Sequence, residues 1–127
     1  MSILILHNFT TLKSGIIIIL QNNGPNSLHG GIVGLDKVLW GSTVDNEAGT
    51  VTFSHYSKDG DEGYPGDVLY NVQYSLDCEG AVKIDFTAMV SAPTPINLAN
   101  HVYFNLAGHR AGAQGTWLCV NSGLSKT

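Results

Sequence analysis

Charge is scarce in this chain, and no part of it is strongly basic. Only 13% of the 127 residues are charged, with 6 Lys and Arg against 10 Asp and Glu, which gives a formal net charge of −4 at pH 7. Because binding to phosphates requires clustered lysine or arginine side chains, this composition argues against a nucleic-acid partner. With 43% hydrophobic residues, the chain has the composition of one globular domain or part of one.

Cysteine is equally scarce, and long apolar runs are missing. The two cysteines, Cys78 and Cys119, form no C-x-x-C pair and stand apart from any histidine cluster, which argues against a zinc site. The apolar stretches at Met1 to Leu6 and Ile16 to Leu20 are too short for a membrane span or a secretory signal. We therefore expect free thiols, a cytoplasmic location, no metal and no membrane partner.

Sustained helical periodicity is also missing, whereas the alternation typical of strands is clear. Val68 to Leu76 has one apolar and one polar face, and Val82 to Val90 repeats this alternation after the turn Asp77 to Gly80. These segments predict an antiparallel hairpin. Two further strands are expected at Thr50 to Ser54 and Ile16 to Leu20. The predicted fold class is all-β, an antiparallel β-sandwich.

Loops rich in glycine, proline, asparagine and aspartate separate the predicted strands, at Gln21 to Gly31, Lys58 to Asp67 and Ser91 to Pro95. The second loop has closely spaced carboxylates, but they do not follow the order of a calcium loop. Gly63 stands at the fifth position, Tyr64 stands where glycine is needed, and no glutamate follows at the twelfth. We expect a solvated hairpin loop that holds no metal.

The five histidines titrate near neutrality, so acid or base chemistry at pH 7 points to them first. His29 precedes two glycines that leave room for a ligand, and His101 lies close to the aromatic residues Tyr103 and Phe104, which could face a sugar ring. By spacing alone the signal is weak, and an isolated histidine is more often a partly buried ring bonded to the backbone. We keep that structural interpretation for the other three, His7, His55 and His109. Trp40 and Tyr64 are further candidates for a stacking surface, although aromatic residues in β-proteins more often fill the core.

Four motifs carry a resemblance to a known family: PNSLHGG (Pro25 to Gly31), GLDKVLW (Gly34 to Trp40), DGDEGYPGD (Asp59 to Asp67) and NHVYFNLAG (Asn100 to Gly108). In this order and spacing they resemble the aldose 1-epimerase family, to which galactose mutarotases belong. The resemblance implies a galactose mutarotase-like supersandwich, incomplete here and entered by a short hairpin that begins near Phe9. It divides the chain into an atypical segment at 1–8, a partial domain at 9–113 and an atypical tail at 114–127.

The resemblance also implies a reaction. Family members interconvert the α and β anomers of galactose, glucose and related aldoses in hexose metabolism, without a cofactor. His101 matches the histidine that acts as general acid on the ring oxygen of the sugar. His29 matches the second active-site histidine, which binds the sugar and stabilises developing charge. Tyr103, which we expect beside the sugar, is predicted from its place near His101 in the sequence.

Two groups of the family site have no match in this sequence, the substrate-binding arginine and the catalytic glutamate. Met1 to Asn8 contains no arginine, and nothing in the sequence places an acidic side chain opposite His101; the candidates are Asp36, Asp61, Glu62 and Glu79. Since general acid–base catalysis is typically worth about 10² to 10⁴ in rate, these residues alone are expected to act close to the spontaneous rate. Whether the chain is an enzyme stays open. The alternatives are a mutarotase completed by other groups, a non-catalytic carbohydrate-binding module, and a non-functional truncated fragment.

Overall fold

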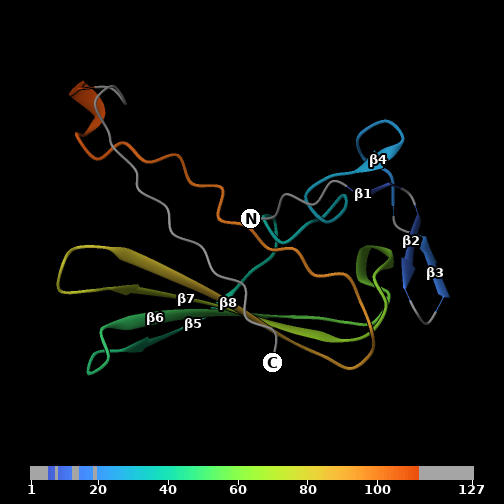
Figure 1. Cartoon of the computed structure of the whole chain (residues 1–127), viewed down its shortest axis with the longest axis horizontal. Helices are drawn as coiled ribbons and strands as arrows, with labels where there is room; N and C mark the ends of the chain where they lie inside the picture. The colour runs from blue at the N-terminus through green and yellow to red at the C-terminus, as the bar shows by residue number, and fades with distance from the viewer. Residues whose placement is uncertain (1–5, 8, 13–14, 19, 112–127) are drawn as a thin grey trace.

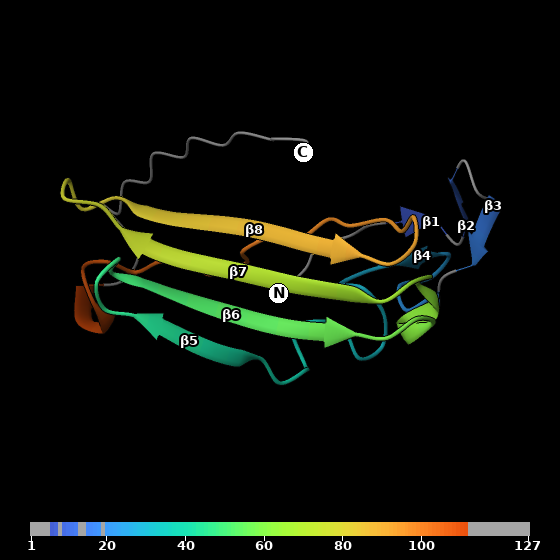
Figure 2. The same cartoon turned by 90° about the horizontal axis from the view of Figure 1, so that it is seen from below.

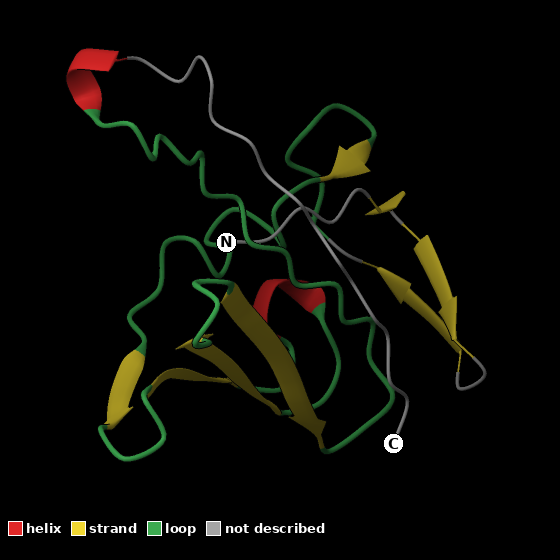
Figure 3. Ribbon diagram, turned by 60° about the vertical axis from the view of Figure 1, so that its left-hand side comes forward, coloured by secondary structure: helices red, strands yellow, loops and turns green. Residues whose placement is uncertain are grey.

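The computed structural model describes residues 6–7, 9–12, 15–18 and 20–111. Strands and loops dominate this part of the chain, and its helical structure consists of two 3-10 turns, η1 (Asp61–Gly63) and η2 (His109–Ala111) (Figure 3). The all-β prediction is therefore confirmed. Within the same ranges, no helix has the length and apolar content needed to cross a membrane. The predicted atypical tail lies outside the described residues, as does most of the predicted atypical N-terminal segment.

Four antiparallel strands form the main sheet, in the order β5-β6-β7-β8 (Figure 2). They are β5 (Gly41–Asp45), β6 (Thr50–Ser57), β7 (Val68–Leu76) and β8 (Val82–Val90). The predicted hairpin is confirmed in its bounds and in its antiparallel register, and the strand predicted at Thr50 to Ser54 is the first part of β6. β5 was not predicted. It is an exposed edge strand with a single large apolar residue, so it lacks the alternation that a half-buried strand shows.

Aspartate side chains close the two short hairpin turns of the main sheet, between β5 and β6 and between β7 and β8. The Oδ1 atom of Asp45 accepts the N–H groups of Glu47 and Ala48 at 3.0 and 2.9 Å. In the predicted turn after β7, the Oδ1 atom of Asp77 accepts the N–H groups of Glu79 and Ala81 at 2.9 and 2.8 Å. An aspartate at the start of a turn satisfies backbone donors that the strand ladder leaves unpaired, which fixes the register of each hairpin.

The main sheet has one apolar face, on which the core begins. Its most buried side chains alternate along β7: Val68, Tyr70 and Val72 are each at most 9% exposed. Burial of a valine or a larger apolar side chain contributes roughly 1.5 to 3 kcal/mol. The segment that follows β8 passes over this face (Figure 1), where the Nδ2 atom of Asn100 donates to the hydroxyl of Tyr74 at 3.0 Å. The apolar face is therefore the one that the long loops cover.

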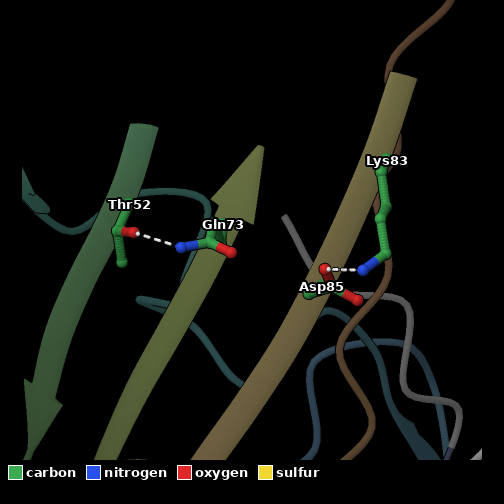
Figure 4. A network of polar contacts seen from close by, with 4 residues as sticks. All are labelled: Thr52, Gln73, Lys83 and Asp85. Atoms are coloured by element: carbon green, nitrogen blue, oxygen red, sulfur yellow. Dashed lines mark hydrogen bonds and ion pairs between the residues drawn. The ribbon is translucent and has the colours of Figure 1, made fainter. Parts of the chain in front are cut away.

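The opposite face of the main sheet is polar. Gln73 donates from its Nε2 atom to the hydroxyl of Thr52 on the neighbouring strand at 3.3 Å, and Lys83 and Asp85 form an ion pair at 2.9 Å (Figure 4). The two charged side chains are 69% and 45% exposed. An ion pair so exposed contributes about 0 to 1 kcal/mol, so this face is suited to solvent and adds little to the core.

An apolar hollow of about 290 Å³ lies on the covered face, between the sheet and the segment after β8. It is lined by Trp40, Phe53, Val72, Tyr74, Phe86 and Leu98. Phe53 and Tyr74 meet edge to face, with ring centroids 5.8 Å apart. Phe53 and Phe86 are each still 37% exposed. Among the described elements there is no second large sheet over this hollow, so the sandwich is formed only in part.

Four short strands gather at the end of the main sheet where β6 ends and β7 begins (Figures 1 and 2). β2 (Phe9–Leu12) and β3 (Gly15–Ile18) form the short hairpin expected near Phe9. β3 confirms the start of the strand predicted at Ile16 to Leu20, whereas Leu20 lies beyond it. β1 (Leu6–His7) pairs with β4 (Asn26–Ser27), the strand from which the His29 loop begins.

Two tyrosines at this end of the fold are expected to make the folded state less stable at alkaline pH. Burial raises the pKa of Tyr64 and Tyr70 above the ordinary value of 10.0. A phenol whose pKa is raised on folding favours the folded state while it is protonated. Its contribution is therefore complete below pH 10.0 and is lost as the pH rises through the folded-state value. We expect the free energy of unfolding to fall above that pH, and Tyr70→Phe to remove part of the fall.

Denaturant unfolding at a series of pH values checks this expectation, with tyrosinate absorbance reporting ionisation. Tyr103→Phe provides the control, because Tyr103 is 86% exposed and its ring contributes nothing to the core. If the free energy of unfolding falls equally at alkaline pH in Tyr70→Phe and in the unsubstituted chain, groups other than Tyr70 cause the fall.

Candidate active site

His29 lies in a tight loop, Leu28 to Gly34, that follows β4. Its backbone has a φ of 58°, in the left-handed region, and its side chain is partly buried. Such a conformation costs a residue other than glycine about 1 to 3 kcal/mol and persists only where neighbouring groups hold it. The position of His29 therefore depends on the contacts of its loop.

Two polar side chains hold this loop from opposite ends. At the start, the Oδ1 atom of Asn22 accepts the N–H of Leu28 at 2.7 Å, while its Nδ2 atom donates to the carbonyl oxygens of Leu28 and Gly31 at 2.7 and 2.6 Å. At the end, the two carboxylate oxygens of Glu62 accept the N–H groups of Ile32 and Val33, each at 2.8 Å. Sequence reasoning identified neither residue as a support of the loop.

Two glycines make this packing possible. A Cβ atom on Gly31 would collide with the carboxylate of Glu62, and one on Gly34 would collide with the carbonyl oxygen of His29. Gly31 also has a φ of 128°, which strains any residue with a side chain. Both positions are buried. The close approach of backbone and carboxylate explains why glycines stand at these two positions of the loop.

His101 reaches the site from a different element, the extended segment that follows β8. Its ring centroid lies 5.9 Å from that of His29, with an angle of 34° between the ring planes. The ring centroid of Tyr103 lies 5.4 Å from that of His101. His101 is exposed, and Tyr103 is 86% exposed. The structure thus brings the three predicted site residues into one group that solvent can reach.

A cavity of about 50 Å³ marks where the histidine loop, η1 and the segment after β8 converge. Gly30 lines it from the loop, Glu62 from η1, and Asn97 from the segment that carries His101. Tyr64 and Tyr70 form part of its wall. The two histidines therefore sit on segments that meet over one end of the main sheet.

Trp40, another aromatic candidate, contacts a different histidine. The ring of Trp40 packs against His55 at 5.4 Å, and its Nε1 atom donates to the carbonyl oxygen of Leu35 at 3.0 Å. The Nδ1 atom of His55 lies 3.0 Å from the carbonyl oxygen of Leu39, so the structural interpretation of His55 is confirmed. The remaining candidates have other surroundings: Tyr64 is in the cavity wall, Phe104 is 39% exposed, and His109 is exposed in η2. The side chain of His7 is outside the described part of the chain.

The acidic loop uses its carboxylates to hold its own shape. The Oδ1 atom of Asp59 accepts the N–H of Gly66, and the Oδ1 atom of Asp67 accepts the N–H of Asp59 at 3.0 Å. The Oδ2 atom of Asp61 accepts the hydroxyl of Ser57 at 2.9 Å. Across the described ranges no group of three or more His, Cys, Asp or Glu residues is arranged to hold a metal ion. The loop is a hydrogen-bonded support for η1.

Comparison with known proteins shows the family to which the chain belongs. The sequence model of the family described as aldose 1-epimerase matches residues 14–125. This chain belongs to the aldose 1-epimerase family. The match includes the His29 loop, η1, the main sheet and the segment that carries His101 and Tyr103. The division of the chain at residues 8 and 113 stays a prediction.

Several members of the aldose 1-epimerase family are similar to this chain over most of its length. It is 54% identical to galactose mutarotase of Bos taurus over 87 residues, which are 68% of this chain and 25% of the bovine protein. It is 39% identical to aldose 1-epimerase of Escherichia coli K12 over 101 residues, which are 80% of this chain and 29% of that protein. The chain thus spans about a quarter of the length of these relatives.

The fold agrees with the family assignment. A crystal structure of an aldose epimerase homologue from C. elegans matches with a TM-score of 0.61 and 27% sequence identity. The superposition covers 69% of this chain and 27% of that one. The antiparallel sheet described above therefore corresponds to one part of an aldose epimerase fold.

Proposed function

We propose that this chain provides the histidine side of a mutarotase site, which interconverts the α and β anomers of galactose and glucose. The observation that carries the proposal is the approach of His29 and His101, whose ring centroids lie 5.9 Å apart although the residues come from separate segments. Tyr103 beside His101 offers an aromatic surface to the sugar. Imidazole is suited to proton transfer at neutral pH, and a shared position lets both rings act on one small substrate.

In the proposed mechanism, His101 starts as the imidazolium and donates its proton to the ring oxygen of the sugar. The anomeric hydroxyl loses its proton to a base, the bond between the anomeric carbon and the ring oxygen breaks, and an open-chain aldehyde forms. Rotation of the aldehyde and reclosure give the other anomer: the hydroxyl on the former ring oxygen returns its proton to His101, and the base returns its proton to the anomeric oxygen. His29 holds the sugar and donates a hydrogen bond to the oxygen on which charge develops.

We propose that the base is a carboxylate outside these 127 residues. Two of the acidic candidates in the chain already serve the fold, because Asp61 accepts the hydroxyl of Ser57 and Glu62 accepts two loop amides. Loss of one partner of an acid–base pair costs about 10² to 10⁴ in rate. The 127 residues alone are therefore expected to leave anomeric equilibration at its spontaneous rate.

A chimera tests this proposal. Residues 14–125, the segment that the family model matches, replace the corresponding segment of Bos taurus galactose mutarotase; we call this protein the bovine chimera. Polarimetry follows the approach of freshly dissolved α-galactose to anomeric equilibrium. We expect the bovine chimera to accelerate this approach and the isolated chain to match a buffer blank. If the folded chimera equilibrates the anomers only at the rate of the buffer blank, the proposed function is wrong.

A second function, non-catalytic binding of carbohydrate, is favoured by the exposure of His101 and Tyr103 on one surface. An aromatic ring beside two imidazoles can stack on a sugar and bond to its hydroxyls without any base. Titration calorimetry of the isolated chain with galactose separates the two functions. Heat of binding together with a blank-level rate in the bovine chimera would favour the binding module over the enzyme.

We also propose a cytoplasmic location with small sugars as partners. The thiol of Cys78 is free and exposed in the turn between β7 and β8, as is typical of proteins in reducing compartments. This location is consistent with a role in hexose metabolism.

A further inference from the structure

We propose that Glu62 is a positioning residue for His29, which it holds against His101 through the backbone of the histidine loop. The inference rests on the proposed function, because it gives Glu62 a role in the geometry of that same site. Glu62 was considered in the sequence only as a substitute for the missing base. Its contacts point to a different role, in which it touches the loop backbone and acts on the sugar only through His29.

The carboxylate of Glu62 accepts hydrogen bonds from two consecutive backbone amides. Its Oε2 atom accepts the N–H of Ile32 and its Oε1 atom accepts the N–H of Val33, each with a donor–acceptor distance of 2.8 Å. Two parallel bonds to one planar group fix the orientation of the backbone as well as its distance. The buried Gly31 lets the carboxylate come this close, since a Cβ atom there would overlap it. The two bonds therefore hold the backbone three and four residues after His29.

Glu62 is itself held firmly against the main sheet. The turn η1 is closed by bonds from the N–H of Gly63 to Gly60 at 3.0 Å and from the N–H of Tyr64 to Asp61 at 2.9 Å. Asp61 accepts the hydroxyl of Ser57, the last residue of β6, at 2.9 Å. A continuous path of bonds therefore runs from the end of β6 through η1 to the histidine loop. Through this path the sheet determines where His29 lies.

Backbone strain occurs on both sides of this contact, in Glu62 itself and in the loop that it binds. Among the described residues other than glycine, His29 and Glu62 are the two with a positive φ, of 58° and 49°. Strained conformations persist where the surrounding structure holds them and are concentrated at functional sites. Here the strained support contacts the loop of the strained histidine. Asn22 bonds separately to Leu28 and to Gly31, on either side of His29, so loss of the Glu62 contact is expected to loosen the loop from Ile32 onward without unfolding it.

The test uses the complete 127-residue chain and nuclear magnetic resonance. Glu62→Gln keeps the size of the side chain but leaves one oxygen acceptor, so one of the two amides loses its partner. We expect exchange of the amide that loses its acceptor, that of Ile32 or of Val33, to accelerate about ten- to a hundredfold, as loss of a bond to a charged acceptor predicts. We also expect the ring signals of His29 to move while those of His55 stay in place. Glu79→Gln, in the exposed turn after β7, is the matched control and is expected to change neither.

Glu62→Asp separates positioning from general stability. Its shorter side chain keeps the charge, so it is expected to restore part of the amide protection and to bring the His29 signals back toward their original positions. If the amides exchange faster but the His29 ring signals stay unchanged in both variants, the inference is wrong. If both variants disturb signals throughout the main sheet, Glu62 is a general structural residue and the inference is equally wrong.

These signals do not depend on turnover, so the two proposals fail separately. A response of His29 to Glu62→Gln together with a blank-level rate in the bovine chimera would overturn the proposed function and leave the positioning role in place. An active bovine chimera together with an unresponsive His29 would overturn the positioning role alone.

Discussion

Replacement of His101 by alanine is expected to slow mutarotation by the bovine chimera about 10²- to 10⁴-fold. The expectation follows from its proposed role, because without a positioned acid the ring oxygen must take its proton from water. His101 is exposed and its ring contacts His29 and Tyr103, so its loss removes no part of the core. Polarimetry at several galactose concentrations measures the effect, which we expect in kcat more than in KM.

The control for this substitution is His109→Ala, which removes another exposed histidine, from η2. It is expected to leave the rate unchanged. If His101→Ala retains the full rate of a folded chimera, His101 is not the general acid. Equal losses in both variants would show that the chimera is sensitive to any change in this segment, which also contradicts a specific role.

The second large effect is expected from the smallest substitution, Gly34→Ala. A Cβ atom at this position would overlap the carbonyl oxygen of His29, and backbone atoms cannot turn aside as the end of a long side chain can. The loop must therefore shift, and the His29 ring shifts with it. Since a displacement of about 1 Å can cost 10²-fold in rate, we expect the bovine chimera with Gly34→Ala to lose about that factor.

Gly41→Ala is the matched control for Gly34→Ala. Neither glycine has a positive φ, but a Cβ atom on Gly41 would meet its nearest atom, the carbonyl oxygen of Ser54, at an ordinary distance of 3.7 Å. We expect the rate with Gly41→Ala to stay close to that of the chimera. Full activity with Gly34→Ala would show that the loop tolerates the shift and that the position of His29 is less critical than its contacts indicate.

The parts of the fold that the sequence predicted are those in which burial controls the pattern. Alternation was clear in Val68 to Leu76 because one face of that strand carries the most buried side chains of the sheet. The turn after it was predictable because Asp77 has a local role that turn chemistry explains. β5 went unpredicted for the opposite reason, since every residue of this edge strand is exposed. Its place is fixed by pairing with β6, which leaves little trace in the strand itself.

The candidate site shows a similar limit. His29 and His101 stood out because their motifs resemble those of a family, whereas their spacing in the sequence gave no sign that their rings would meet. Asn22 and Glu62 were not recognised as supports because they bond to backbone groups, which every residue offers. A loop residue that binds main chain follows no periodicity and pairs with no particular residue type. Such contacts become visible only when the path of the backbone is known.

The way in which Glu62 binds the histidine loop determines which sequences the loop can accept. Glu62 contacts the main-chain N–H groups of Ile32 and Val33, and their side chains are 58% and 52% exposed. The anchor is therefore indifferent to the side chains at these two positions, provided that neither is proline, which has no N–H to offer. Evolution can change the surface beside the site while His29 keeps its place. Substitution of Ile32 or Val33 by any residue other than proline is thus expected to keep the two bonds that hold the loop.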